Sequence, residues 1–262
     1  MKLYRIYGIM LKNLYYTRRN LDRIFDVFYW PVVGLFTWGF TTLYLRNVTQ
    51  SSKFISFFLG ALILWMFVQR WQQDISTFML TDFWSQNIYN MFSSPITNFE
   101  LFLGTALFSG VRALISLGLL LVLAALFYAF NLLSIGVFGL AMLAASLAIF
   151  GSGLGLFVAG LIYRFGQRIQ VFAWSTIVLL QPFSAVFYPR DVLPGVFHDV
   201  SLALPTSYVF EGMRASLQTG VIPWSDIGIS FALSFLYFGL GYLAFHVLLE
   251  RSRRGGYLAQ NN

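Results

Sequence analysis

The sequence contains six long apolar segments separated by short polar ones. This pattern constrains the fold more than any other feature of the chain. Hydrophobic residues make up 58% of the sequence and charged residues 10%, whereas charged residues make up about 25% of a typical soluble domain. A helix needs roughly 20 predominantly apolar residues to cross the hydrocarbon core of a bilayer. The sequence therefore predicts an all-α polytopic membrane protein, with residues 1–262 as one transmembrane domain. The expected spans are residues 27–45, 54–80, 101–127, 133–162, 169–188 and 227–249.

The first 26 residues have the pattern of a basic amphipathic helix. Leu3, Ile6, Met10 and Leu14 recur at helical spacing, and most of the lysines and arginines fall elsewhere around the helix. Helices of this kind lie in the headgroup plane of a bilayer, with the apolar face toward the acyl chains. We therefore expect residues 1–26 to form an interfacial helix ahead of the first span.

The second span contains a belt of polar residues. Residues 54–68 are too short to cross the bilayer alone, and the chain becomes apolar again only after the belt. We expect one long helix over 54–80, in which Arg70 and Asp74 form an ion pair because they lie four residues apart. The alternative is a span that ends near Trp71.

Polar residues inside the spans are candidates for a translocation pathway, because such residues are costly in hydrocarbon. Arg112, in the third span, is expected to extend toward the inner headgroups, and a position on a polar pathway is the alternative. The candidate pathway residues are Gln69, Arg70, Gln73, Asp74 and Arg112.

A run of small residues occurs in the fourth span. Gly151 and Gly155 are four residues apart, a spacing that lets two helices approach closely. The same run is a weak candidate for a phosphate-binding loop, because it sits deep in an apolar helix with no strand before it. We expect the packing role.

The longest polar interruption, Gln69–Gly104, includes a corner at residues 85–100 between the second and third spans. Residues 85–92 suit a short amphipathic helix with Ile88, Met91 and Phe92 on one face, and Pro95 prevents its continuation. Thr97 or Asn98 can cap the next helix, with Glu100 in its first turn. We expect this corner to be a docking site through which a partner protein transmits movement to the membrane helices. The candidate coupling residues are Gln86, Asn87, Ile88, Tyr89, Asn90, Met91, Phe92, Ser94, Pro95 and Glu100.

Prolines divide the apolar segment that follows the fifth span. Pro189, Pro194 and Pro205 leave pieces too short to cross the bilayer, so residues 189–220 are expected to form a re-entrant outer gate. Glu211 and Arg214 lie three residues apart and can pair on one helix face.

The distribution of positive charge predicts the topology. Lysines and arginines concentrate at both termini and at residues 164–168, which indicates cytoplasmic termini and a multi-pass protein of the plasma membrane. This bias accounts for the net charge of +7, so no nucleic-acid partner is expected. The predicted inner loop 81–100 lacks lysine and arginine, which suggests that a partner protein shapes its surface. The chain has no cysteine and only two histidines, so no metal site is expected.

This order of parts resembles the type-2 ABC exporter permeases, a family that exports polysaccharides, lipid-linked glycans and drugs. The most specific matches are Ser94-Pro95 with Glu100 and Gly104, and the segment from Phe187 through Pro194 to Pro205. One departure is Ser85-Gln86-Asn87, where the family usually carries an acidic Gly-Thr stretch. The resemblance implies six-span subunits that work as a homodimer or with a related permease. It also implies two cytoplasmic ABC ATPase subunits, with residues 85–100 as the coupling corner.

No G-x-x-x-x-G-K-[ST] loop occurs in the sequence, so ATP and Mg²⁺ are expected on the partner ATPase and no cofactor in this chain. No catalytic site is expected either. Two other functions remain alternatives: a secondary transporter, which predicts inverted repeats, and a membrane-embedded lipid-modifying enzyme, for which His246 lacks an evident partner group.

Aromatic residues make up 19% of the chain and crowd the first two spans. They suit either stacking on sugar rings or ordinary contact with lipid. The expected substrate is a glycan, a lipid-linked molecule or an amphiphilic drug-like molecule. The lipid bilayer is the expected surroundings of the protein.

Overall fold

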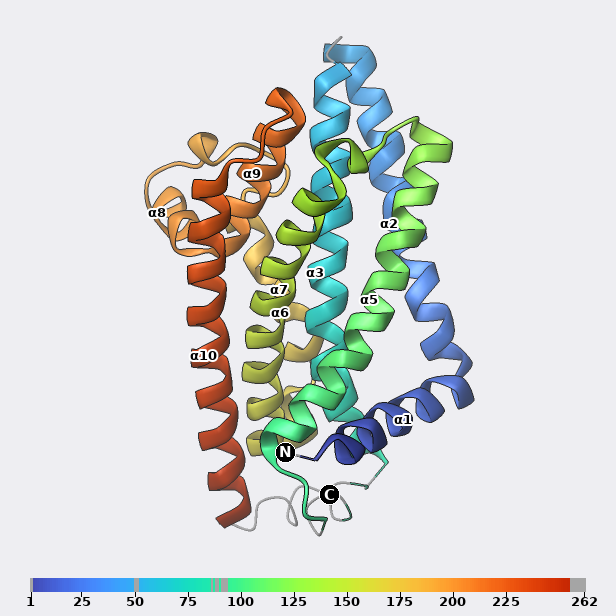
Figure 1. Cartoon of the computed structure of the whole chain (residues 1–262), viewed down its shortest axis with the longest axis vertical. Coiled ribbons are helices and arrows are strands. Elements are labelled where there is room, and N and C mark those ends of the chain that lie inside the picture. Colours follow the sequence, from blue (N-terminus) through green and yellow to red (C-terminus); the bar gives the residue numbers. More distant parts are fainter. Residues whose placement is uncertain (1, 50–51, 86, 88–89, 91–93, 255–262) are drawn as a thin grey trace.

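The computed structural model describes residues 2–49, 52–85, 87, 90 and 94–254. Helix accounts for 88% of the structure, and the described part of the chain contains no strand, which confirms the all-α class. Figure 1 shows the long helices side by side in an upright bundle. The α-helices are α1 (Leu3–Arg19), α2 (Leu21–Thr49), α3 (Ser52–Trp84), α5 (Asn98–Tyr128), α6 (Val137–Phe165), α7 (Phe172–Leu180), α8 (Val196–Ala203), α9 (Pro205–Thr219) and α10 (Trp224–Arg254).

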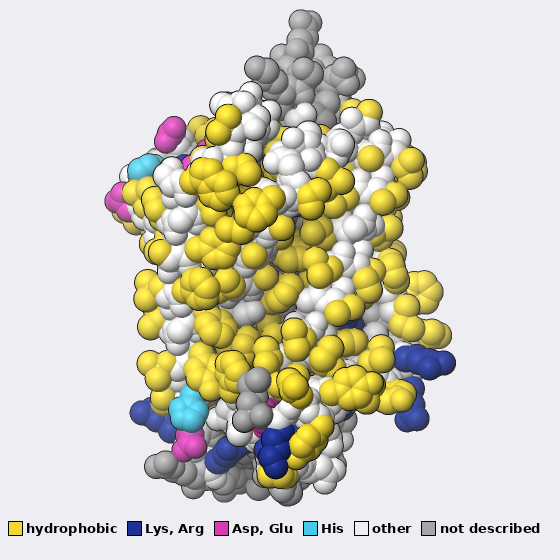
Figure 2. All heavy atoms as spheres, viewed as in Figure 1, with side chains coloured by type: hydrophobic (Ala, Val, Ile, Leu, Met, Phe, Trp, Pro, Cys, Tyr) yellow, Lys and Arg dark blue, Asp and Glu magenta, His cyan; other side chains and the backbone are white. Residues whose placement is uncertain are grey.

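Four helical segments in the described ranges are long and apolar enough to cross a membrane: Leu21–Leu45, Asn98–Tyr128, Val137–Ile169 and Trp224–Arg253. Figure 2 shows that hydrophobic side chains cover most of the height of one face, and that lysine and arginine gather near the end that carries α1. We call this end the α1 end, and the opposite end, beside α8, the α8 end (Figure 1).

Helix α3 runs through the middle of the bundle (Figure 1). It is one unbroken helix of 33 residues, about 50 Å long at 1.5 Å per residue. The long-helix interpretation of residues 54–80 is therefore correct, and the alternative end near Trp71 is wrong. Most of α3 is buried, including the polar residues Arg70, Gln72 and Asp74.

The predicted span 169–188 is not one continuous helix. Helix α7 ends at Leu180 and passes into a 3-10 turn at Gln181–Phe183. Pro182 lies in the first turn of that 3-10 segment, where its missing N–H is tolerated. The apolar helical piece Phe172–Phe183 is shorter than the roughly 20 residues that cross a bilayer.

Glycines on α6 allow close contact with helices on two sides. A Cβ on Gly155 would lie 2.9 Å from Ile75 Cβ on α3. A Cβ on Gly153 would lie 2.6 Å from the backbone oxygen of Tyr237 on α10. The packing role predicted for the small residues of this run is confirmed.

The N-terminal segment is two helices rather than one over residues 1–26. The chain breaks at Asn20, which has extended backbone angles and whose side chain donates a hydrogen bond of 2.7 Å to the Tyr16 carbonyl oxygen. Helix α1 then crosses the end of the bundle obliquely and packs on α5 (Figure 1). Ile6 and Ile9 of its apolar stripe are buried against protein, whereas Leu3 remains 77% exposed.

Candidate functional site

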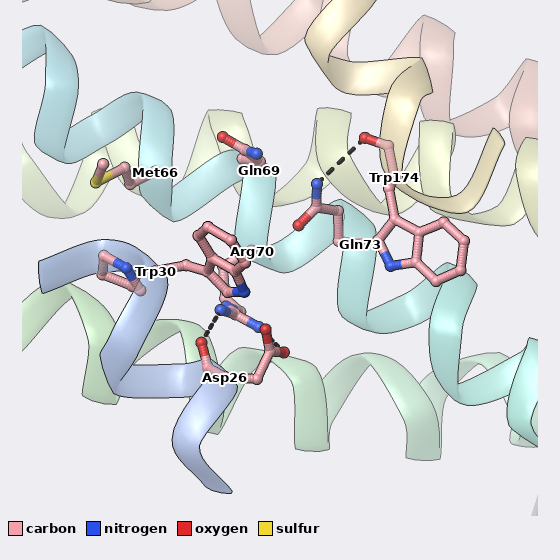
Figure 3. A pocket seen from close by; sticks show the side chains of 8 residues that line it. Asp26, Trp30, Met66, Gln69, Arg70, Gln73 and Trp174 are labelled. Atoms are coloured by element: carbon pink, nitrogen blue, oxygen red, sulfur yellow. Dashed lines mark hydrogen bonds and ion pairs between the residues drawn. The ribbon is translucent and has the colours of Figure 1, made fainter. Parts of the chain in front are cut away.

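A polar pocket opens between α2, α3 and α7 (Figure 3). Its volume is about 460 Å³. Two tryptophans, two glutamines and an ion pair give it a mixed polar and aromatic lining. The lining residues are Asp26, Trp30 and Pro31 of α2, Met66, Gln69, Arg70 and Gln73 of α3, and Trp174 of α7.

Helix periodicity explains how α3 contributes to the polar pocket. Gln69 and Gln73 are four residues apart and therefore share one face of the helix. Gln73 Nε2 donates a hydrogen bond of 3.2 Å to the Trp174 carbonyl oxygen, which ties α7 to α3 (Figure 3). Gln72 points elsewhere, is fully buried and donates to Ser76 Oγ at 2.9 Å. Of the polar residues on this part of α3, Gln69 and Gln73 therefore face the pocket, whereas Gln72 packs against protein.

Four charged side chains meet beside the polar pocket, and we call Asp26, Arg70, Asp74 and Arg112 the charge cluster. Arg70 NH1 lies 2.6 Å from Asp26 Oδ2 and 3.5 Å from Asp74 Oδ1. Arg112 Nε lies 2.9 Å from Asp74 Oδ2, although its N–H is not directed at that oxygen and neither atom makes a hydrogen bond. Arg112 NH2 lies 3.6 Å from Asp26 Oδ2. The cluster joins α2, α3 and α5 and sums to zero charge.

The ion pair predicted between Arg70 and Asp74 is present, and Arg112 is buried in contact with α1 and the start of α2. Arg112 is 4% exposed and does not reach toward solvent at the end of the helix. It donates hydrogen bonds of 3.3 Å to Thr17 Oγ1 and to the Arg23 carbonyl oxygen. The two carboxylates of the cluster attract it inward, so it joins the polar residues next to the pocket.

Sequence reasoning missed Asp26 and Trp174. Asp26 falls at the end of the predicted interfacial helix, but it lies in the second turn of α2 and faces two arginines. A usable signal was present: the cluster has two arginines within spans and only one aspartate, so a second carboxylate was needed nearby.

Helix α1 holds the start of α5 at the α1 end. Thr97 caps α5, and Thr97 and Glu100 form the reciprocal hydrogen bonds of a capping box. Glu100 Oε1 also accepts a hydrogen bond of 2.7 Å from the Lys2 backbone N–H, and Arg5 NH1 lies 3.4 Å from Glu100 Oε2. Arg5 donates a further hydrogen bond to the Pro95 carbonyl oxygen. The predicted cap is confirmed at Thr97.

A second contact ties α1 to the end of α3. Lys12 Nζ lies 2.7 Å from Asp82 Oδ1 and 2.9 Å from Asp82 Oδ2. Between the two attachment points lies a groove of about 400 Å³, lined by residues of α1 and by Asn87, Asn90, Ser94, Pro95 and Ile96. Asn90 Nδ2 donates to Asn87 Oδ1 at 3.4 Å. The other predicted coupling residues, Gln86, Ile88, Tyr89, Met91 and Phe92, lie outside the described residues.

Glu211 and Arg214 fasten the segment before η4 (Arg190–Val192) to α9. The predicted pair is present, with Arg214 NH2 2.9 Å from Glu211 Oε1. Arg214 also donates to the carbonyl oxygens of Ala185, at 2.8 Å, and Val186, at 3.2 Å. Pro189 immediately precedes η4, Pro194 precedes α8, and Pro205 opens α9. These prolines set the boundaries of the short elements at the α8 end.

Groups of at least three His, Asp or Glu side chains that could hold a metal ion do not occur in the described part of the chain. His246, the histidine considered for an enzyme site, has its Nδ1 3.1 Å from Asn98 Nδ2 and so links α10 to α5.

The family comparison agrees with this architecture. The model of the ABC-2 type transporter family matches residues 9–217, which is most of the chain and covers α2 through most of α9. A comparison with curated proteins finds no match. The resemblance to type-2 ABC permeases is confirmed, and the chain belongs to the ABC-2 type transporter family.

Proposed function

We propose that this chain is the permease subunit of an ATP-driven exporter in the plasma membrane, and that the polar pocket is part of its translocation pathway. The expected cargo is a glycan, a lipid-linked molecule or an amphiphilic drug-like molecule. The observation that carries the proposal is the polar pocket itself, because Gln69, Arg70 and Gln73 line a cavity between α2, α3 and α7 in a chain with four helices long and apolar enough to cross a membrane. Polar and ionisable side chains within membrane-crossing bundles are costly, and those that face a cavity commonly mark a substrate pathway.

A second permease subunit, either another copy or a related chain, completes the pathway in this proposal. Helix α2 forms one wall of the pocket, yet only 22% of its membrane-crossing window is buried in the single chain. Tyr29, Trp30 and Trp38 on α2 are between 43% and 63% exposed, and Leu179 on α7 is 62% exposed. A partner subunit packed on α2 and α7 would cover these side chains and close the pocket away from lipid.

The proposed topology has six passes and cytoplasmic termini. Helix α3 supplies one pass in addition to the four apolar segments, and the whole segment 169–188, of which α7 and η3 are the helical part, supplies the sixth. Helices α8 and α9 form the re-entrant outer gate, held by Glu211 and Arg214. The α1 end then faces the cytoplasm, in keeping with its lysines and arginines.

Two ABC ATPase subunits, which carry ATP and Mg²⁺, drive the transport and dock at residues 85–100. Helix α1 supports this coupling corner through Lys12–Asp82 on one side and Arg5–Glu100 on the other. Motion of the corner is thereby passed both to α3, which lines the pocket, and to α5, which carries Arg112.

The test is reconstitution of the chain in liposomes with and without its ATPase subunit. We expect no ATP hydrolysis from the chain alone, and ATP-dependent transport with the subunit. Met91→Asp should abolish both ATPase binding and transport. Val221→Asp, at a position 66% exposed between α9 and α10, is the matched control and should change neither. Transport driven by an ion gradient without ATP would contradict the proposal and favour a secondary transporter.

A further inference from the structure

The charge cluster is neutral only because α2 contributes to it. Asp74 of α3 lies between Arg70 and Arg112, and all three side chains are at most 7% exposed. These three residues, from α3 and α5, carry a net charge of +1. The remaining carboxylate, Asp26, comes from α2 and is 28% exposed.

Asp26 binds Arg70 in the way that an anionic ligand would. Arg70 NH1 donates to its carboxylate at 2.6 Å, and Arg70 NH2 donates to its backbone carbonyl oxygen. The Asp26 carboxylate also lies 3.6 Å from Arg112 NH2, so two guanidinium groups face one oxygen. Guanidinium groups bind carboxylate and phosphate with similar geometry.

The surroundings allow Asp26 to be exchanged for a ligand. Asp26 and Arg70 both line the polar pocket, so the site is open to a molecule within it (Figure 3). Only 22% of the membrane-crossing window of α2, which carries Asp26, is buried in the single chain. If Asp26 leaves, the buried positive charge needs another anion, because an uncompensated charge at that depth is unfavourable.

We propose that Arg70 and Arg112 form an anion subsite, and that a phosphate or carboxylate group of the transported molecule replaces Asp26 there. This inference rests on the proposed function, since it assigns the cargo to that pathway. Trp30 and Trp174 add aromatic rings to the lining of the same pocket, and Gln69 and Gln73 supply amide groups for a sugar or other polar head. The cargo class is therefore an acidic glycan or an acidic amphiphile.

The experiment measures binding to the full-length chain in nanodiscs of neutral phosphatidylcholine, without any ATPase. Octyl phosphate is the anionic probe, and octyl glucoside is a neutral probe with the same tail. Titration calorimetry on the wild type should give tighter binding of octyl phosphate. Asp26→Asn removes the competing carboxylate and should tighten octyl phosphate binding on the order of tenfold, because a larger fraction of the protein is then free to bind.

Two further variants sharpen the result. Arg70→Gln should remove the preference for octyl phosphate over octyl glucoside. Asp22→Asn is the matched control, because Asp22 also lies on α2 but has a side chain 77% exposed and does not line the polar pocket. It should leave the affinity for octyl phosphate unchanged.

Inorganic phosphate is the third probe and tests whether the site binds more than the anion itself. Tighter binding of octyl phosphate than of phosphate supports an acidic amphiphile, and equal binding of the two would contradict that cargo class. Unchanged or weaker binding of octyl phosphate to Asp26→Asn would overturn the inference. Equal binding of both octyl probes to the wild type would overturn it without any variant.

These outcomes are separate from those of the reconstitution with the ATPase. Loss of the anion preference together with intact ATP-dependent transport would refute the subsite alone. An anion preference in a chain that never transports with an ATPase would refute the proposed function alone.

Discussion

Asp74 of α3 lies 2.9 Å from Arg112 of α5, and both side chains are at most 5% exposed. The pair is therefore buried, and each charge compensates the other, together with Arg70 and Asp26. Breaking such a pair by removing one partner costs about 3–5 kcal/mol, whereas replacing both partners costs far less.

Arg112→Met should destabilise the protein by an amount in that range, because Asp74 is left with Arg70 alone. Asp74→Leu combined with Arg112→Met should be milder than Arg112→Met. Thermal unfolding in detergent, followed by circular dichroism, measures both variants. Arg251→Met, at an exposed position on α10, is the control. Destabilisation by the double variant as large as that of the single one would show that the pair is not the interaction that matters.

The attachment of α1 to α5 can be tested at Glu100. Glu100→Ala removes the side chain that completes the capping box and that accepts from Lys2 and lies beside Arg5. We expect the amides of α1 to exchange with deuterium faster, since α1 loses this attachment while Lys12–Asp82 remains. Hydrogen exchange followed by mass spectrometry is the measurement. Asp199→Ala, with a side chain 79% exposed, should leave exchange in α1 unchanged.

Replacement by alanine should have opposite effects on stability at Gly153, where α6 packs on α10, and at Gly118, which faces open space on α5. Gly153→Ala should lower the unfolding temperature by several degrees, because the new Cβ would lie 2.6 Å from the backbone oxygen of Tyr237. Gly118→Ala on α5 meets nothing within 4 Å. Alanine is the better helix former by about 1 kcal/mol, so this control should be neutral or stabilising. A stabilising effect of Gly153→Ala would contradict the close helix contact.

Contacts within one helix could be predicted from the sequence. The pairs Arg70–Asp74 and Glu211–Arg214, and the cap formed by Thr97 and Glu100, follow from residue spacing alone. The small residues of α6 also identified a packing surface, because their spacing fixes the face they occupy.

Contacts between helices could not be predicted in the same way. Arg112 turns inward because Asp26 and Asp74 lie near it, and the position of Asp26 depends on how α2 packs against α3 and α5. Pro182 indicates a kink in the apolar run 169–188, but it does not reveal that α7 ends at Leu180 and passes into a 3-10 turn at Gln181. Composition gave the class of protein, but tertiary packing decided which polar residues share a pocket.

A pocket that is part of a translocation pathway must be accessible to water, and the absence of native cysteine allows a direct measurement of that access. Gln69→Cys places a thiol in the pocket lining, and Leu126→Cys places one at a position 74% exposed on α5. A charged, membrane-impermeant thiol reagent reacts with thiolates, which form in water and not in hydrocarbon. In proteoliposomes that also contain the ATPase, we predict that Gln69→Cys reacts at least about tenfold faster than Leu126→Cys, and that its rate changes when ATP is added. Equal, slow reaction of the two variants with and without ATP would contradict the account.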